Sequence, residues 1–230
     1  MKVDSSAQLP LNLSLDSETR FHNFFEFNCE AELIKELKGQ SPFIYLWGSA
    51  GSGRSHLLQA VCHDAYRNQK STMFVPLAKA GNYSPEILSG IEGMSVVCLD
   101  DIQAIAMNLD WEEAIFRLYN NVQQTGCRLV VSSDRPPQNL IITLADLQSR
   151  LCGFPVFMLH SPDEKERFQI LKFRAELRGV NLDNDVLNYI SNNMRRSLHE
   201  IIELLNALDE ASKIEKRKIT IPFIKKVMNW

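Results

Sequence analysis

A glycine-rich segment that ends in arginine and serine is the part of the sequence best suited to chemistry. Residues 48–55 read GSAGSGRS, directly after an apolar run and directly before a helical pattern. Glycines let the backbone turn so that several N–H groups point at one phosphate, and the helix N-terminus adds its dipole. The segment therefore predicts a phosphate-binding P-loop, and its candidate nucleotide-binding residues are Gly48, Gly51, Ser52, Gly53, Arg54, Ser55 and His56.

One position departs from the usual P-loop pattern, G-x-x-x-x-G-K-[ST]. Gly48, Gly53 and Ser55 meet the pattern, but Arg54 stands where lysine is usual. Lysine is a compact ammonium that fits between phosphates, whereas arginine is a broad planar fork. We expect phosphate binding to tolerate this change better than hydrolysis does. An ordinary glycine-rich turn between a strand and a helix is the alternative interpretation.

Two neighbouring carboxylates form a second motif. Asp100 and Asp101 end an apolar run at residues 96–99, and ligands bind at the carboxyl ends of the strands in parallel sheets. Because Mg²⁺ prefers oxygen ligands and keeps part of its water shell, Asp100 together with Ser55 is the candidate Mg²⁺ site. Asp101 is placed to orient an attacking water. The alternative is that the two aspartates merely end a strand.

A parallel sheet is needed to bring these residues together. Short apolar runs, rich in β-branched and aromatic residues, predict five buried parallel strands at 43–47, 72–77, 96–99, 128–131 and 156–159. Helical patterns follow the P-loop from 54 to 68 and recur at 111–122. A short helix is expected at 31–37, ended by Gly39 in a left-handed conformation. The predicted fold class is α/β, a doubly wound layer.

The pattern changes at Ser161, after which no strand-like run follows. Ser161, Pro162 and Glu164 predict a helix start with a hydroxyl cap and a capping box. Apolar residues at helical spacing then predict four helices, at 168–175, 186–194, 198–208 and 224–228. We predict a flexible tail at 1–17, a nucleotide-binding αβα domain at 18–160 and a small all-helical lid domain at 161–230.

Composition narrows the function classes. The 25 basic and 28 acidic residues give a net charge of −3, which argues against a general basic surface for nucleic acid but leaves a local basic patch open. The five cysteines form no C-x-x-C pair and the histidines show no ligand spacing, so no metal other than Mg²⁺ is expected.

No apolar stretch approaches the ~18 residues of a membrane span, and the start is too polar for a signal peptide. We therefore expect a soluble protein of the cytoplasm.

Four motifs resemble those of the DnaA-type replication initiators, which are AAA+ proteins. Residues 99–103, LDDIQ, resemble their strand-four motif, and residues 131–137, VSSDRPP, resemble their sensor 1 segment. Residues 147–153, LQSRLCG, are similar to the arginine-finger segment, and residues 195–200, RRSLHE, resemble the start of the sensor 2 helix. The resemblance implies an AAA+ P-loop domain with a five-stranded parallel sheet, followed by the helical lid.

The resemblance also implies roles for three residues. Arg150 would act in trans, at the nucleotide of a neighbouring AAA+ subunit, whereas a surface arginine paired with Asp146 is the alternative. Asp134 would lie beside the two aspartates as the sensor 1 residue, or else favour a local turn. Arg196 would sense phosphate from the lid, with Arg195 as the competing assignment.

The tail carries a hexapeptide, QLPLNL at residues 8–13, that looks like the peptide with which bacterial proteins dock on the sliding clamp. An extended, proline-stiffened peptide can place Leu9, Leu11 and Leu13 in an apolar groove while the Gln8 amide makes hydrogen bonds at its edge. A tail without function is the alternative. No helix-turn-helix pattern follows the lid, so we do not expect a full initiator.

Together these features resemble the DnaA-related regulators that switch the initiator off. They imply a negative regulator of replication initiation that docks on the DNA-loaded β sliding clamp and supplies Arg150 to stimulate ATP hydrolysis by DnaA. The implied cofactors are ADP or another nucleotide and Mg²⁺, with weak or no intrinsic ATPase activity. DNA would be reached mainly through the clamp, no membrane partner is expected, and the oligomeric state is left open. The alternatives are an autonomous AAA+ ATPase of the helicase-loader type and a non-catalytic adaptor between clamp and initiator.

Overall fold

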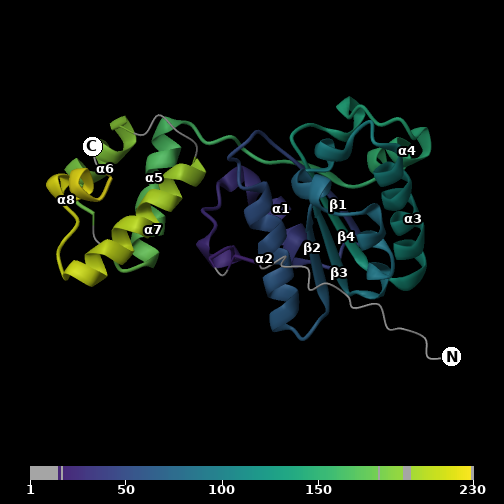
Figure 1. Cartoon of the computed structure of the whole chain (residues 1–230), viewed down its shortest axis with the longest axis horizontal. Coiled ribbons are helices and arrows are strands. Elements are labelled where there is room, and N and C mark those ends of the chain that lie inside the picture. Colours follow the sequence, from purple (N-terminus) through teal and green to yellow (C-terminus); the bar gives the residue numbers. More distant parts are fainter. Residues whose placement is uncertain (1–14, 17, 181, 194–197, 229–230) are drawn as a thin grey trace.

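The computed structural model describes residues 15–16, 18–180, 182–193 and 198–228. A sheet covered by helices occupies one end of the molecule and a group of helices the other (Figure 1). This arrangement confirms the predicted fold class, an α/β layer with a helical lid. The division of the chain at residues 17 and 160 stays a prediction.

The sheet contains five parallel strands in the order β2-β3-β4-β1-β5. Their bounds are β1 Phe43–Trp47, β2 Thr72–Pro76, β3 Val96–Asp100, β4 Arg128–Ser133 and β5 Val156–Met158. The prediction that all five are buried is wrong for β5, where Val156 is 38% and Met158 62% exposed. The reason is its place at the sheet edge, where only one neighbour, β1, pairs with it.

Helices cover both faces of the sheet. Helices α1 (Ala31–Lys38) and α2 (Arg54–Arg67) lie on the side toward the lid, and α3 (Leu109–Thr125) and α4 (Ala145–Cys152) lie on the far side (Figure 1). Because side chains alternate along a strand, Ile44 and Leu46 of β1 pack with α1 and α2, whereas Tyr45 packs with α3 and α4. Short 3₁₀ helices connect these elements: η1 Phe21–Asn23, η2 Asn28–Glu30, η3 Leu77–Asn82, η4 Pro85–Leu88, η5 Ile91–Gly93, η6 Ile102–Ile105 and η7 Pro137–Asn139.

The lid has a hydrophobic core of its own. Its helices are α5 (Glu164–Leu177), α6 (Asn184–Asn193), α7 (Leu198–Glu215) and α8 (Ile221–Met228). Leu187, Ile190, Leu205, Leu208 and Ile224 are fully buried among them. The four predicted helices are therefore confirmed, and their apolar stripes meet in one cluster.

The start of α5 differs from the prediction. Asp163 caps the helix and Glu166 completes the capping box, so the assignment of these roles to Ser161 and Glu164 is wrong. A carboxylate is a stronger acceptor for the free N–H groups of the first turn than a hydroxyl. The Ser161 hydroxyl instead hydrogen-bonds the Ser49 hydroxyl of the P-loop at 2.8 Å.

Gly39 ends α1 as expected, but not in the left-handed conformation. Its φ is −80° and its ψ −159°. A Cβ at this position would lie 3.2 Å from the carbonyl oxygen of Glu36 and 3.3 Å from that of Lys35. The glycine is therefore suited to a close approach between the chain and the last turn of the helix, rather than to a positive φ.

A buried carboxylate fastens α3 to the loops before α3 and α4. Glu112 has no exposed surface. Its Oε1 accepts the N–H groups of Met107 at 2.9 Å and Thr143 at 3.1 Å, and its Oε2 accepts that of Leu144 at 2.8 Å. Three backbone donors thus depend on one side chain, which no sequence motif identified.

Glu112→Ala should lower the free energy of unfolding by about 3 kcal/mol, because three N–H groups lose a charged acceptor. Urea denaturation measures the change. Glu113→Ala is the matched control, since this neighbour is half exposed and forms an exposed ion pair with Arg117, and it should cost less than about 0.5 kcal/mol. Equal losses in the two variants would contradict the role given to Glu112.

Candidate functional site

The P-loop lies between β1 and α2 and has the backbone geometry of an anion cradle. Gly51 and Gly53 have φ angles of 80° and 97°, which side-chain-bearing residues rarely adopt. A Cβ on Gly48 would lie 2.7 Å from Ser52 Oγ. Gly53 precedes α2 and has no side chain to cap it, so the free N–H groups of the first turn face the loop. The turn therefore fits a phosphate.

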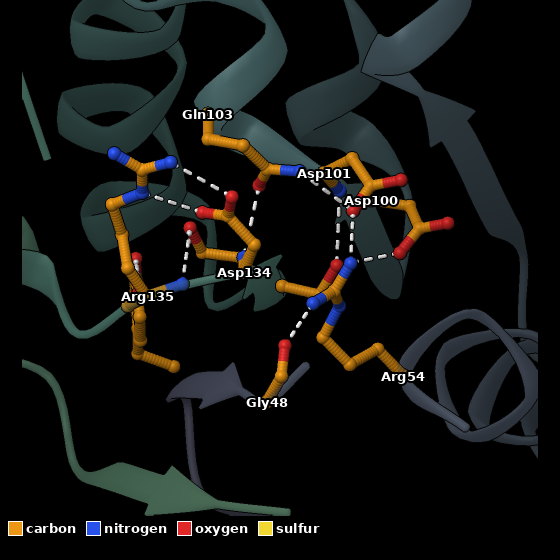
Figure 2. Close-up of polar contacts among 10 residues, drawn as sticks. Gly48, Arg54, Asp100, Asp101, Gln103, Asp134 and Arg135 are labelled. Atoms are coloured by element: carbon orange, nitrogen blue, oxygen red, sulfur yellow. Dashed lines mark hydrogen bonds and ion pairs between the residues drawn. The ribbon is translucent and has the colours of Figure 1, made fainter. Parts of the chain in front are cut away.

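Arg54 folds back over the P-loop instead of extending from it. One guanidinium nitrogen, Nη2, lies 2.7 Å from Asp101 Oδ1, and the other, Nη1, donates to the carbonyl oxygen of Gly48 (Figure 2). The side chain is only 10% exposed, and its Nε is buried without a partner among the described residues. The arginine thus links the first residue of the loop to the end of β3.

The two aspartates are joined through a serine of the strand between β1 and β3. Ser132 on β4 donates to Asp100 Oδ1 at 2.5 Å and accepts the N–H of Asp101 at 2.9 Å. Asp101 has a φ of 58° and a ψ of 55°, a left-handed conformation that aspartate tolerates. Burial raises the pKa of Asp100, while hydrogen bonds from Ser132 and Ser55 act in the opposite direction. The sequence-predicted pair Asp100 and Ser55 therefore lies together.

Gln103 connects Asp101 to Asp134. Its Nε2 donates to Asp101 Oδ1 at 2.9 Å, and its Oε1 accepts the N–H of Asp134 at 3.1 Å (Figure 2). Arg135 binds both oxygens of the Asp134 carboxylate, at 2.6 and 2.8 Å, and these hydrogen bonds lower the pKa of Asp134. Asp134 is thus placed beside the two aspartates, but its carboxylate is engaged by its neighbour. Its predicted role toward water or Mg²⁺ stays a prediction.

A cavity of about 380 Å³ opens over the P-loop. Its lining combines the P-loop with apolar side chains, including Phe24 and Phe25 of the N-terminal segment and Ile170 of the lid. Burial lowers the pKa of His56 to about 4, although its hydrogen bond to the Arg20 carbonyl acts against this. A neutral imidazole is therefore part of the cavity lining. A lining that combines the loop with apolar and aromatic side chains suits a ligand that carries both phosphates and a ring.

Arg174 is a cavity residue that the sequence analysis missed. It comes from α5 of the lid, is only 4% exposed, and donates from Nη1 to the carbonyl oxygen of Asn23 at 2.8 Å. Its Nε is buried without a partner among the described residues. The signal that could have found Arg174 is its spacing. It lies four positions after the apolar residue Ile170, and residues four apart share one face of a helix.

The nucleotide expected from the sequence fits this site. Ser52 Oγ is buried without a partner among the described residues, as are the Nε atoms of Arg54 and Arg174, and all three residues line the cavity. Orphaned donors around an uncapped helix N-terminus are suited to phosphate oxygens. The residues for Mg²⁺ also fit in chemical type, because Asp100 and Ser55 offer oxygen ligands. No cluster of three or more His, Cys, Asp or Glu residues suited to a metal occurs within the described residues.

The other predicted residues lie elsewhere. Arg150 is exposed on α4, where its guanidinium lies 5.7 Å from the centre of the Tyr119 ring, and it is not among the residues lining the cavity. The clamp-binding candidates Gln8, Leu9, Leu11 and Leu13 and the sensor 2 candidates Arg195 and Arg196 lie outside the described residues.

Two further expectations concern the chain as a whole. All five cysteines are free. Among the described residues, no helix combines the length and the apolar character needed to cross a bilayer.

Comparisons with known proteins agree with the geometry. Residues 22–154 match the family of the bacterial DnaA ATPase domain, and residues 163–228 match the family of the Hda lid domain. An uncharacterized protein of Haemophilus influenzae is 36% identical over 228 residues, which covers 96% of this chain and 98% of that protein.

Solved structures share the fold. Domain III of the Thermotoga maritima initiator DnaA has a TM-score of 0.75 at 21% identity, covering 94% of this chain and 98% of that one. AMPPCP-bound DnaA from Aquifex aeolicus has a TM-score of 0.69 at 23% identity, covering 87% and 67%. The P-loop, the paired aspartates and these matches together show that the chain belongs to the DnaA-related AAA+ family and carries a lid of the Hda type.

Proposed function

We propose that this protein is a nucleotide-binding negative regulator of replication initiation that stimulates ATP hydrolysis by DnaA. Docked on the DNA-loaded β sliding clamp, it supplies Arg150 to the nucleotide of a DnaA subunit. The observation that carries the proposal is the contrast between two arginines. Arg54 pairs with Asp101 of the same chain, whereas Arg150 is exposed on α4 and does not line the nucleotide cavity of this chain.

Engagement of Asp101 disfavours hydrolysis in the chain's own site. Its Oδ1 accepts hydrogen bonds from both Arg54 and Gln103, so this oxygen is already occupied by donors of the chain. To orient a water, Asp101 would have to release these partners. ATP hydrolysis in the protein's own site is therefore expected to be weak, which argues against an autonomous ATPase of the helicase-loader type.

The nucleotide in the chain's own cavity has a structural role in this proposal. ADP is the expected ligand because two phosphates satisfy the uncapped start of α2 without a catalytic step. When bound, its phosphates supply negative charge, and Mg²⁺ at Asp100 and Ser55 would balance part of it. Ser52 from the P-loop and Arg174 from the lid both offer buried donors to the cavity, so binding would couple the lid to the sheet domain.

The setting of Arg150 suits action on a partner. The Tyr119 ring beneath its guanidinium supports the side chain through a cation–π contact, while its exposure leaves the donors accessible. An arginine supplied in trans stabilises charge on the transferring phosphoryl group and is worth ~10³ to ~10⁵ in rate. A bare adaptor between clamp and initiator would not need an arginine here.

Clamp docking rests on the peptide at residues 8–13. The chain that follows it is fastened to α2: the Asp16 N–H donates to Gln59 at 2.8 Å, and His63 hydrogen-bonds the Asp16 carbonyl at 2.9 Å. Asp16, near the start of the described chain after this peptide, therefore lies against α2. With the clamp around DNA, the regulator would meet initiator molecules near replicated DNA.

Arg150→Ala should reduce stimulated ATP hydrolysis by DnaA at least a hundredfold, toward the rate without regulator. The assay mixes DNA-loaded clamp, ATP-loaded DnaA and regulator, omits each in turn, and follows ADP production. Arg117→Ala is the matched control, since Arg117 is an exposed arginine of α3 paired with Glu113, and it should retain full stimulation. Full stimulation by Arg150→Ala would instead support the non-catalytic adaptor.

Arg54→Lys should raise the protein's own ATPase rate several-fold, because one ammonium cannot hold Gly48 and Asp101 as the forked guanidinium does. Steady-state turnover of the isolated protein measures this. Arg67→Lys, at the other end of α2, should leave the rate unchanged. If Arg54→Lys binds nucleotide but turns over no faster than the parent, the ion pair does not restrain hydrolysis.

Arg174→Met should weaken ADP binding about tenfold, because a charged donor to the cavity is lost. The thermal shift caused by ADP reports the change. Lys172→Met is the control, since Lys172 is exposed on the same helix, and it should keep the full shift. An undiminished shift in Arg174→Met would show that Arg174 acts only in lid packing.

A further inference from the structure

A second hollow, of about 230 Å³, lies against α2 away from the P-loop. Its polar lining consists of Arg20 and His22 from the N-terminal segment, Lys38 from the end of α1, and His63, Asp64 and Arg67 from α2. We call this the basic hollow. No residue lines both this hollow and the nucleotide cavity.

Cations outnumber carboxylates in the basic hollow, whereas the reverse holds for the whole sequence. Three permanent cations and two imidazoles face one carboxylate there, although acidic residues outnumber basic ones in the whole sequence. Concave surfaces lined by one sign of charge focus the field and raise the local concentration of the opposite ion. The basic hollow therefore attracts anions where the protein as a whole does not.

Several residues of the basic hollow are held in place by contacts with their surroundings. Lys38 Nζ lies 5.3 Å from the centre of the Phe21 ring, and His63 Nε2 is fixed by its hydrogen bond to the Asp16 carbonyl. The floor includes Ala60, a small and buried side chain that leaves space above it. Lys38 and Arg67 each lie in the last turn of a helix, where cations offset the dipole. Arg20 and His22 lie outside both helices.

The position also separates the basic hollow from the nucleotide phosphates. His63 and Arg67 come nine and thirteen residues after Arg54, which at about 1.5 Å per residue places them roughly 14 and 20 Å along α2. A ligand here would not be the nucleotide of the P-loop. Since His22, Lys38 and Arg67 are all exposed at the rim, an extended anion can reach several of them at once.

We propose that the basic hollow binds backbone phosphates of nucleic acid, independently of sequence. A chain of phosphates suits cations that are spread over a rim, because each contact releases counterions and the contacts add up along the strand. This goes beyond the proposed function, in which DNA is reached mainly through the clamp. It depends on neither Arg150 nor the peptide at 8–13.

The test measures binding of the full chain to a labelled mixed-sequence duplex of about twenty base pairs by fluorescence anisotropy, between about 50 and about 200 mM salt. The double variant Lys38→Glu with Arg67→Glu should weaken binding at least tenfold and lower the slope of log affinity against log salt by about 2. The double variant Lys79→Glu with Lys172→Glu carries the same change in net charge on exposed residues elsewhere, and it should lose much less.

Equal losses in the two double variants would overturn the proposal, because only the net charge would then matter. Loss in neither would overturn it as well. Tripolyphosphate is the second probe: if it binds at the basic hollow while the duplex does not, the assignment to nucleic acid is wrong. An unchanged ADP-induced thermal shift shows that the fold and the nucleotide cavity are intact. If charge reversal disturbs folding, Lys38→Gln with Arg67→Gln gives the same comparison.

Discussion

The site depends on how charges are balanced where the carboxyl ends of three parallel strands meet. The strand order places β4 between β1, which leads into the P-loop, and β3, which ends in two carboxylates. Neighbouring strands are about 4.8 Å apart, so the loop and the aspartates are separated by roughly 10 Å. Ser132 on β4 fills the middle of this gap, and the long side chain of Arg54 spans it. The Asp101 carboxylate, the Arg54 guanidinium and the start of α2 are thereby brought close together, so that their charges offset one another.

In the proposed function, this balance lets the chain keep an AAA+ nucleotide site with little turnover of its own. Among the described residues, Ser52 Oγ has no partner and the start of α2 has no side-chain cap, whereas Asp101, the group that would act on water, is paired with Arg54. The proposal therefore assigns the separation of binding from hydrolysis to the side chain of Arg54. The lid helix α5 is tied to the N-terminal segment by the hydrogen bond from Arg174 to Asn23, and Ser161, just before it, contacts Ser49 of the P-loop. The proposal uses these contacts to couple the lid to the nucleotide.

The sequence predicted those features that follow from local pattern. The P-loop, the strand that ends in Asp100 and the helix stripes are short-range signals, and the structure places Ser55, Asp100 and Asp101 together as expected. Contacts that depend on the tertiary fold could not be predicted from spacing. Glu112 and Ser132 contact segments that are distant in sequence, and the pairing of Asp134 with Arg135 depends on the rotamers of the two side chains. The cap of α5 was misplaced by two residues because Ser161 and Asp163 both offer acceptors, and only the path of the chain past the P-loop selects between them.

The most direct measurement follows the nucleotide itself. Initiator loaded with radiolabelled ATP is mixed with DNA-loaded clamp and with this protein preloaded with unlabelled ADP, and the two AAA+ proteins are then separated. Action in trans predicts that labelled ADP is recovered on the initiator while the nucleotide on this protein stays unlabelled. Labelled ADP recovered on this protein, or stimulation that requires ATP in its own cavity, would contradict the proposal.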